Sequence, residues 1–199
     1  HGARVRRIDE AFFMQADAVK AVTLEGVDAV MTDVPKVCVS VSTADCIPIL
    51  IYDRVHHAVV AVHAGWRGTV LRIVEAVLHA MSGAYGTRPQ DVEAAIGPGI
   101  SLEAFEVGDE VYEAFRTTGF PMEEMARRYP VAGDGSDRME KWHLDLWQAN
   151  RGLLEDCGVP SARIHLAGVC TYGHSERFFS ARRLGIRSGR ILNGIFLTD

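Results

Sequence analysis

The stretch HAVVAVHAGWRGTV, residues 57–70, joins a strand pattern to a helix pattern. Its first part, up to His63, is apolar and rich in β-branched valine, as in a buried strand. Beyond Gly68, apolar residues recur at the spacing of one helix face: Val70, Leu71, Val74, Val77, Leu78 and Met81. We therefore expect His63 to lie at the junction where a strand ends and a helix begins, a place where polar groups can converge on a ligand.

A second apolar run, Ile47–Tyr52, precedes this stretch and is separated from it by the turn-like sequence DRVH. The two runs predict an antiparallel hairpin. Pro48 has no amide hydrogen, so its strand should lie at a sheet edge or begin there. In such a hairpin the start of the first strand and the end of the second are adjacent, which would bring Cys46 to His63.

The remaining chain alternates strand and helix patterns without a linker or an internal repeat. Strands are expected in residues 37–42, 91–96, 163–172 and 191–197. Helices are expected in three places: from Gly68 to an end within residues 82–86, within residues 101–115, and from Asp145 to Gly158. Residues 116–137 are expected to be mostly loop around a short helix. These patterns predict an α+β (mixed α/β) fold, with mixed β-sheets flanked by helices, in one domain over residues 1–199.

The composition limits the kind of partner and compartment. The 199 residues are 48% hydrophobic with a formal net charge of −5, which does not suit nucleic-acid binding. There is no apolar run of about 20 residues for a membrane span and no signal-peptide pattern. Four widely spaced cysteines indicate reduced thiols in a cytoplasm, with Cys38 and Cys157 as small buried hydrophobic residues. The chain begins with His1, so we expect preceding residues to be missing.

Cys46 and His63 allow two kinds of chemistry. A thiolate and an imidazole are good zinc ligands, and a third ligand plus an open position would make a catalytic metal site. Alternatively, Cys46 could be a nucleophile activated by His63, with Asp45 or a residue not identified from the sequence orienting the imidazole. The spacing of these residues does not separate the two.

Two further regions offer groups for an anionic or sugar-bearing substrate. The turns HAGWRG and IGPGI could present backbone amides, from Gly97 to Gly99 in the second case, and Arg67 could bind phosphate. Residues 170–183, CTYGHSERFFSARR, add Ser180, Arg182 and Arg183, with Phe178 or Phe179 as an apolar wall. The HSE in this segment lacks the P-C-x-x-C that zinc nucleoside deaminases require. The other histidines are expected to be structural or exposed.

Taken together, TADCIPILIYD, AVHAGWRGTV, AAIGPGISLEAFEVGDEV, WHLDLWQANRGLLEDCGV and CTYGHSERFFSARR resemble the laccase-domain, or YfiH-like, family. The resemblance covers the chain from His1 almost to its end. It implies an α/β arrangement of mixed sheets and a zinc bound by two histidines and one cysteine. The family's ADC cysteine corresponds to Cys46 and its HAGWRG histidine to His63. Its first histidine lies in an upstream Q-x-H-G motif, to which the opening His1–Gly2 corresponds.

The resemblance also implies an activity. Members act as purine nucleoside phosphorylases on adenosine, inosine and methylthioadenosine, with adenosine deaminase activity, so the partners would be purine nucleosides and phosphate. Arg67, Arg182, Cys170 and the amides at Gly97 and Gly99 would then bind substrate. Three alternatives are a Cys–His hydrolase or amidase editing peptidoglycan precursors, a copper-dependent polyphenol oxidase, and a non-catalytic binding protein. The oligomeric state is left open.

Overall fold

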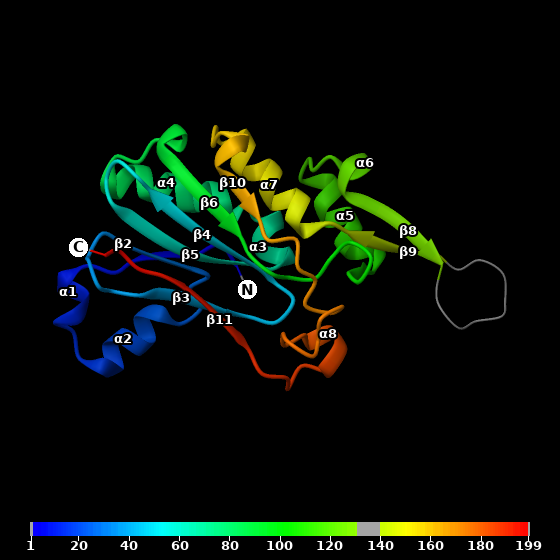
Figure 1. Cartoon of the computed structure of the whole chain (residues 1–199), viewed down its shortest axis with the longest axis horizontal. Helices are drawn as coiled ribbons and strands as arrows, with labels where there is room; N and C mark the ends of the chain where they lie inside the picture. The colour runs from blue at the N-terminus through cyan, green and yellow to red at the C-terminus, as the bar shows by residue number, and fades with distance from the viewer. Residues whose placement is uncertain (1, 131–139, 199) are drawn as a thin grey trace.

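A computed structural model describes residues 2–130 and 140–198 (Figure 1). Its centre is a six-stranded mixed sheet in the order β1-β2-β5-β4-β6-β10. The outer pairs β1–β2 and β10–β6 are parallel and the inner pairs are antiparallel. In the order of the sheet, the strands are Val5–Arg7, Ala29–Thr32, Ala58–Ala64, Ile47–Asp53, Val92–Ile96 and Ile164–Leu166.

Two smaller sheets accompany the central one. The ribbon of β3 (Val39–Thr43) and β11 (Ile191–Ile195) is antiparallel and packs on one face of the central sheet, where Val59 and Ala61 of β5 meet it. A second, three-stranded sheet has the order β7-β9-β8, with bounds Glu106–Val107, Glu140–Leu144 and Ala126–Pro130. The α+β prediction with mixed sheets is therefore confirmed.

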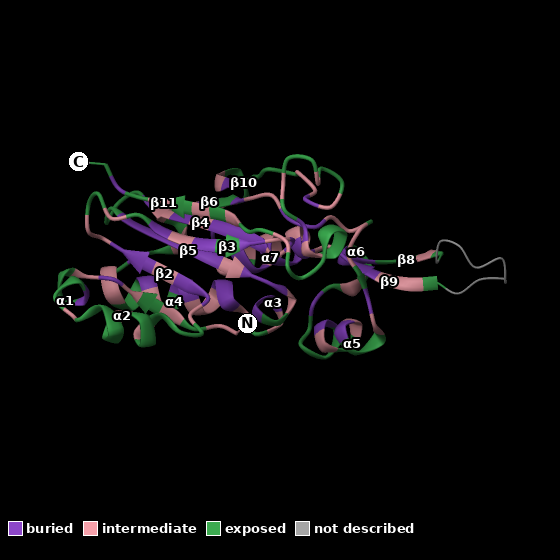
Figure 2. Cartoon of the chain, turned by 90° about the horizontal axis from the view of Figure 1, so that it is seen from below, coloured by how far each residue is buried: buried purple, intermediate pink, exposed green. Residues whose placement is uncertain are grey.

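Helices cover the other face of the central sheet. The alternate residues Val60 and Val62 of β5 pack there in the main hydrophobic cluster, together with residues of α4 and α7. Figure 2 shows the central strands β4 and β5 coloured as buried. The helices, in chain order, are α1 Glu10–Phe13, α2 Asp17–Leu24, α3 Trp66–Val70, α4 Ile73–Tyr85, α5 Asp109–Thr117, α6 Met122–Met125, α7 Leu146–Asp156 and α8 Ala181–Leu184. None of the described helices is long and apolar enough to cross a membrane.

The predicted hairpin is present, with β4 and β5 paired from Ile47↔Ala64 to Asp53↔Ala58. The edge placement of its proline was wrong, because β4 lies between β5 and β6. Pro48 is instead tolerated because it stands near the start of β4, one residue before the ladder with β6 begins at Ile49. The alternative, that the strand begins there, was right.

The helix expected after Gly68 is divided into α3 and α4. Arg72 between them adopts left-handed backbone angles, with φ of 56°, and Leu71 is 59% exposed. The break redirects the chain, so Leu71 leaves the buried face while Val74, Val77, Leu78 and Met81 keep it. The expected stop is confirmed, since α4 ends at Tyr85 and Gly86 caps it. The helix from Asp145 is also confirmed, with the Asp145 carboxylate accepting from the Gln148 amide at 2.9 Å.

Two other expectations were wrong. Residues 126–130 were expected in a loop but form β8, which pairs with β9; a guanidinium–indole contact of 4.5 Å between Arg128 and Trp142 accompanies the pairing. Cys38 was expected to be buried but is exposed, since the end of the ribbon leaves its side chain uncovered, whereas Cys157 is half-buried.

Candidate functional site

The open end of the β4–β5 hairpin brings Cys46 and His63 together. Because Pro48 pairs with His63 and Ile47 with Ala64, Cys46 lies beside Gly65. The position that a Cβ would take on Gly65 is 3.0 Å from the Cys46 sulfur and 3.7 Å from Cε1 of His63. The two side chains therefore converge on one small volume, as the sequence predicted. His1, the third expected ligand, lies outside the described residues.

A carboxylate that the sequence analysis missed contacts this histidine. Oδ1 of Asp28 lies 3.3 Å from Nδ1 of His63, and the two side chains are 7% and 12% exposed. Burial lowers the pKa of His63 below its ordinary value, although the neighbouring carboxylate opposes that shift. The ring is therefore held as a neutral imidazole, the form that binds metal ions.

The Cys46 thiol is in an environment that disfavours its ionisation. Burial, and after it the charge of Asp45, raise the pKa of Cys46 to about 11. Arg190 acts in the opposite direction, so its charge also reaches this sulfur. At neutral pH the thiol stays protonated unless a cation binds it.

From the sequence we had expected Asp45 to orient the imidazole of His63. In the structure its carboxylate has other partners. Its Oδ1 accepts a hydrogen bond from the Thr171 hydroxyl at 2.7 Å, and its Oδ2 accepts one from the Arg182 amide at 2.7 Å. Its carbonyl oxygen accepts from the Ile100 amide at 2.9 Å, and its own φ is 83°. Asp45 therefore ties the start of β4 to the C-terminal segment, and the orienting contact belongs to Asp28.

The turn that contains Gly97 and Gly99 is packed tightly against the start of β4. The Gly97 amide donates to the Pro48 carbonyl at 2.9 Å and the Gly99 amide to the Val169 carbonyl at 3.2 Å. A Cβ on Gly97 would lie 2.9 Å from Cγ of Pro48, and one on Gly99 would collide with Cδ1 of Ile47. These amides are engaged within the fold, so the structure accounts for both glycines by close packing.

Cys170 lies next to this turn, in a parallel bridge with Gly99. The amides of Ser101 and Gly173 both lie 3.4 Å from its sulfur, within hydrogen-bonding distance. Burial alone would raise the pKa of Cys170, but the hydrogen bonds that its sulfur accepts lower it below the ordinary value. Cys170 is thus the cysteine near the site whose surroundings favour a thiolate, in contrast to Cys46.

The two arginines expected to bind substrate are both exposed. The Arg67 guanidinium lies 4.2 Å from the centre of the Trp66 ring, at the start of α3. Arg182 is attached to the site through its own amide, which donates to Asp45, while its guanidinium donates to the Glu106 carbonyl at 2.9 Å. The structure thus brings the backbone of Arg182 to the site and turns its side chain toward β7.

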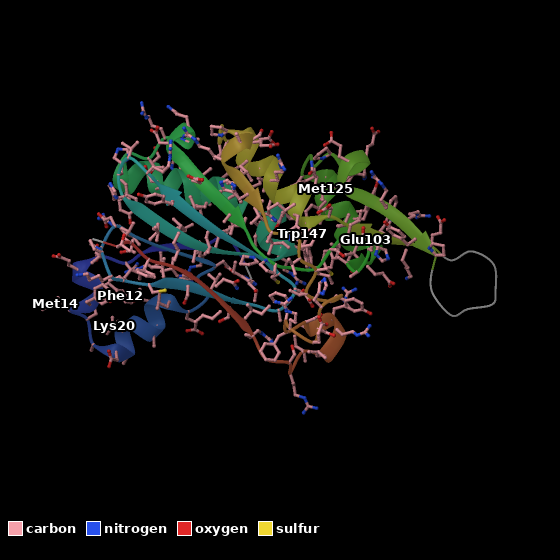
Figure 3. The ribbon with its side chains drawn as sticks, in the orientation of Figure 1. Phe12, Met14, Lys20, Glu103, Met125 and Trp147 are labelled. Carbon is pink, nitrogen blue, oxygen red and sulfur yellow. The ribbon has the colours of Figure 1, made fainter. Side chains whose placement is uncertain are left out.

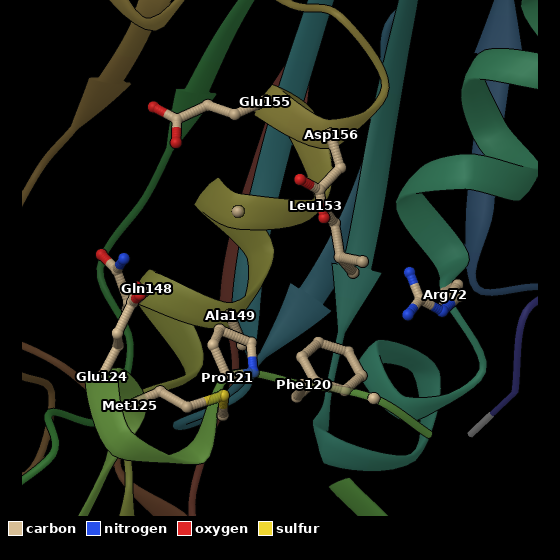
Figure 4. Close-up of a pocket in the computed structure, with 12 residues that line it drawn as sticks. Arg72, Phe120, Pro121, Glu124, Met125, Gln148, Ala149, Leu153, Glu155 and Asp156 are labelled. Atoms are coloured by element: carbon tan, nitrogen blue, oxygen red, sulfur yellow. The ribbon is translucent and has the colours of Figure 1, made fainter. Parts of the chain in front are cut away.

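An open cavity of about 410 Å³ is lined by both residues of the imidazole–carboxylate pair. Its wall consists of Leu24, Gly26, Val27, Asp28, Val30, Ser40, Val41, Ser42 and His63. A more enclosed cavity of about 240 Å³ lies between α7 and the residues around Phe120 and Met125 (Figure 4). None of the predicted site residues lines that second cavity.

Trp147 lies on the first turn of α7 (Figure 3). Its indole Nε1 donates to the Gly97 carbonyl at 3.2 Å, which fixes the glycine turn to the helix. Phe12 and Met14, also marked in Figure 3, belong to the N-terminal region around α1, where Phe12 is 7% and Met14 is 87% exposed.

The donor set fits a zinc ion in part. Residues 2–130 and 140–198 contain no group of three or more His, Cys, Asp or Glu side chains arranged to hold a metal. Cys46 and His63 supply two donors of the types that zinc prefers. The Asp28 Oδ2 is buried and has no hydrogen-bond partner among the described residues, which is consistent with a positive charge nearby.

The other described histidines do not join this cluster. His56 contacts Asp53, His57 contacts Tyr52, His143 contacts the Leu102 carbonyl and His165 contacts Glu93. Tyr52, Asp53 and Glu93 lie near one another on β4 and β6, at the end of these strands remote from Cys46, and the described residues form no metal-binding group of three or more His, Cys, Asp or Glu side chains. In the described part of the chain, the histidines are therefore not grouped as a multicopper centre requires.

A family model described as "Multi-copper polyphenol oxidoreductase laccase" matches residues 1–198. The chain belongs to this laccase-like family. A protein of Bacteroides thetaiotaomicron named purine nucleoside phosphorylase is 48% identical over 197 residues, which cover 99% of this chain and 70% of that protein. "Adenosine deaminase RL5", from an unknown prokaryotic organism, is 43% identical and is matched over 98% of this chain and 72% of its own length.

Solved structures of the laccase-like family share this fold. The YfiH protein of Bacillus licheniformis superposes with a TM-score of 0.84 at 29% identity, over 100% of this chain and 72% of that one. YlmD of Geobacillus stearothermophilus gives a TM-score of 0.82 at 29% identity, over 100% of this chain and 71% of that one. The resemblance drawn from the motifs is therefore confirmed.

Proposed function

We propose that this laccase-like chain is a zinc-dependent purine nucleoside phosphorylase with adenosine deaminase activity. The observation that carries the proposal is the convergence of the Cys46 sulfur and the His63 imidazole at the open end of the hairpin. The relatives named purine nucleoside phosphorylase and adenosine deaminase support the type of reaction. The substrates would be phosphate and the nucleosides adenosine, inosine and methylthioadenosine, in a cytoplasmic enzyme that folds as one domain.

Zinc would be held by Cys46, His63 and His1. A thiolate and neutral imidazoles leave one position of a tetrahedral site for water or substrate. When bound, zinc would supply a positive centre that polarises a substrate oxygen and makes water more acidic. Since the pKa of the free Cys46 thiol is raised to about 11, the thiol would ionise only as the metal binds.

The chain's own side chains would then bind and orient the substrate. His63 keeps its orientation through Asp28, and Asp45 fixes the start of β4 on which Cys46 stands. Arg67 is exposed two residues beyond Gly65, where its guanidinium could pair with phosphate. Cys170 and Arg182 would contribute contacts from the C-terminal side of the site.

The Cys–His hydrolase is a weaker second candidate. A nucleophilic dyad of the thiolate–imidazolium type needs a thiol with a lowered pKa. Here the pKa of Cys46 is raised and that of His63 is lowered, both first of all by burial. These surroundings favour the neutral pair, which suits two ligands awaiting a metal better than an activated nucleophile.

The proposal is tested by replacing Cys46 with alanine in the full-length enzyme. Purified protein is incubated with phosphate and inosine, the released base is separated and quantified, and bound zinc is measured by elemental analysis. We expect phosphorolysis to fall by at least about 100-fold and zinc to be lost, because one of three ligands is missing. Adenosine and methylthioadenosine are assayed in parallel.

The matched control is Cys157→Ala, which removes a half-buried thiol on α7's C-cap, outside the site. It should keep its zinc and its turnover. If the Cys46→Ala protein contains no zinc and still catalyses phosphorolysis at the wild-type rate, the reaction does not depend on the metal. A wild-type enzyme that binds zinc but releases no base from any of the nucleosides would contradict the proposed activity.

A further inference from the structure

We infer that Asp28 is a positioning residue: it fixes the His63 tautomer and supplies a second negative charge beside the metal position. The inference rests on the proposed zinc site, but not on the identity of the reaction catalysed there. It follows from the geometry of the Asp28–His63 pair and from the burial of the carboxylate.

The two residues are joined through the backbone as well as through their side chains. The His63 amide donates to the Asp28 carbonyl at 2.7 Å, at the point where β2 runs beside β5. The Asp28 amide in turn donates to the Arg4 carbonyl at 2.9 Å. The Asp28 backbone is therefore held by its neighbouring strands at a place from which its side chain reaches the imidazole.

This contact decides which nitrogen of His63 carries the proton. An ionised carboxylate can only accept hydrogen bonds, so Nδ1 must be the donor toward Oδ1 of Asp28. In a neutral imidazole the lone pair is then on Nε2. A carboxylate bonded to the second nitrogen of a metal-binding histidine is a common way to fix ring orientation and increase ligand basicity.

The second oxygen of Asp28 points to a need for positive charge. It is buried and has no hydrogen-bond partner among the described residues, although a buried carboxylate oxygen is costly without compensation. A divalent ion held by His63 and the Cys46 thiolate would place positive charge in the neighbourhood of this carboxylate. The carboxylate and the thiolate together balance the two charges of such an ion.

Two substitutions separate these contributions in full-length protein. Asp28→Asn keeps an oxygen that can accept from Nδ1 but removes the charge, whereas Asp28→Ala removes both. Asp33→Asn is the control, because Asp33 is a half-exposed partner of Arg7 outside the site. Zinc affinity is measured by competition with a chromophoric chelator, and the His63 tautomer by nitrogen NMR of the metal-free protein.

We expect Asp28→Asn to bind zinc about tenfold more weakly and Asp28→Ala up to about 100-fold more weakly, with no change in the control. The proton should be on Nδ1 in the wild type and in Asp28→Asn, and distributed over both nitrogens in Asp28→Ala. If Asp28→Ala does not fold, the inference is tested by two remaining measurements: the zinc affinity of Asp28→Asn and the tautomer of His63 in the wild type.

Zinc affinity in Asp28→Asn equal to that of the wild type, or a wild-type His63 protonated on Nε2, would overturn the inference. Both measurements use zinc or the metal-free protein and no nucleoside. The inference can therefore stand if nucleoside phosphorolysis fails, and it can fail while the Cys46→Ala experiment supports the proposed reaction.

Discussion

The two ends of the β4–β5 hairpin each carry a contact between an aspartate and a histidine, but the contacts differ. At the turn end, Asp53 is fully buried, and its carboxylate accepts from the amides of Val55 and His56 at 2.9 and 3.0 Å. Its other oxygen lies 2.8 Å from Nδ1 of His56. At the open end, Oδ1 of Asp28 contacts His63, and its Oδ2 has no hydrogen-bond partner among the described residues.

The difference shows how to tell a structural pair from a site pair. Asp53 and His56 are three residues apart, and the hydrogen bonds that satisfy them come from their own turn. Asp28 and His63 are 35 residues apart and meet only because β2 pairs with β5. Every acceptor is used in the turn pair, whereas the site pair retains capacity for a further charged group. We expect substitutions in the turn pair, Asp53 and His56, to change stability and substitutions in the site pair, Asp28 and His63, to change metal binding.

The largest effect on stability is expected from Asp45→Ala, at the open end. The substitution leaves the buried Thr171 hydroxyl and the Arg182 amide without their acceptor, and it places alanine at a φ of 83°. Unsatisfied buried donors and left-handed strain together predict a loss of about 3 kcal/mol in the free energy of unfolding. Urea denaturation followed by tryptophan fluorescence measures it.

Asp45→Asn is the matched control, since it keeps an acceptor oxygen and asparagine tolerates left-handed angles. It should lose about half as much stability as Asp45→Ala. If Asp45→Ala unfolds at the wild-type urea concentration and yet loses activity, Asp45 acts on the chemistry, as the sequence analysis first assumed.

The sequence was sufficient where the signal was local or followed from the hairpin. Alternating and helical patterns predicted β4, β5 and the helix from Asp145, and the hairpin alone predicted that Cys46 meets His63. Asp28 could not be found in this way, because its contact with His63 depends on which strand lies beside β5. The role of Asp45 was wrong for a similar reason: its partners Thr171 and Arg182 lie more than 120 positions away.

Other differences have local causes that periodicity does not report. The break between α3 and α4 depends on a left-handed Arg72, a conformation for which arginine gives no composition signal. The strand β8 contains two arginines and a proline, which indicate a loop, and it forms because β9 pairs with it. The need for glycine at positions 97 and 99 likewise comes from close packing against β4, and the sequence does not show that β4 lies beside this turn.

At the turn end, Asp53→Asn should lower stability in a pH-dependent manner. Burial would raise the pKa of Asp53, but its interactions with the nearby Thr87 side chain and the hydrogen bonds from His56 and Val55 prevail and lower it below its ordinary value of 3.8. The folded state thus favours the ionised carboxylate, so its contribution is complete well above pH 3.8 and is lost as the pH falls below it. We expect a loss of about 2 kcal/mol at pH 7.

Urea denaturation of wild type and Asp53→Asn at pH 7 and at about pH 3 measures this difference, which should shrink at the lower pH. Zinc affinity at pH 7 should remain that of the wild type, because Asp53 lies at the opposite end of the hairpin. A loss of zinc affinity as large as that of Asp28→Asn would erase the distinction between the two ends.

The smallest expected effect comes from Gly65→Ala, which tests the open end with a single methyl group. The backbone of Gly65, with φ of −76° and ψ of 170°, suits alanine, so the free energy of unfolding should change by less than about 1 kcal/mol. The new Cβ would lie 3.0 Å from the Cys46 sulfur, which must move by a few tenths of an ångström. Since zinc–sulfur distances tolerate about 0.2 Å, we expect zinc affinity to fall about tenfold.

Gly83→Ala is the control for this methyl group, because a Cβ on Gly83 in α4 meets no other atom within 4 Å. It should stabilise the helix by up to about 1 kcal/mol without changing zinc affinity. Chelator competition and urea denaturation of both variants supply the comparison. If Gly65→Ala binds zinc as tightly as Gly83→Ala, the volume shared by Cys46 and His63 does not hold the metal, and the open end would be no more than a second structural terminus of the hairpin.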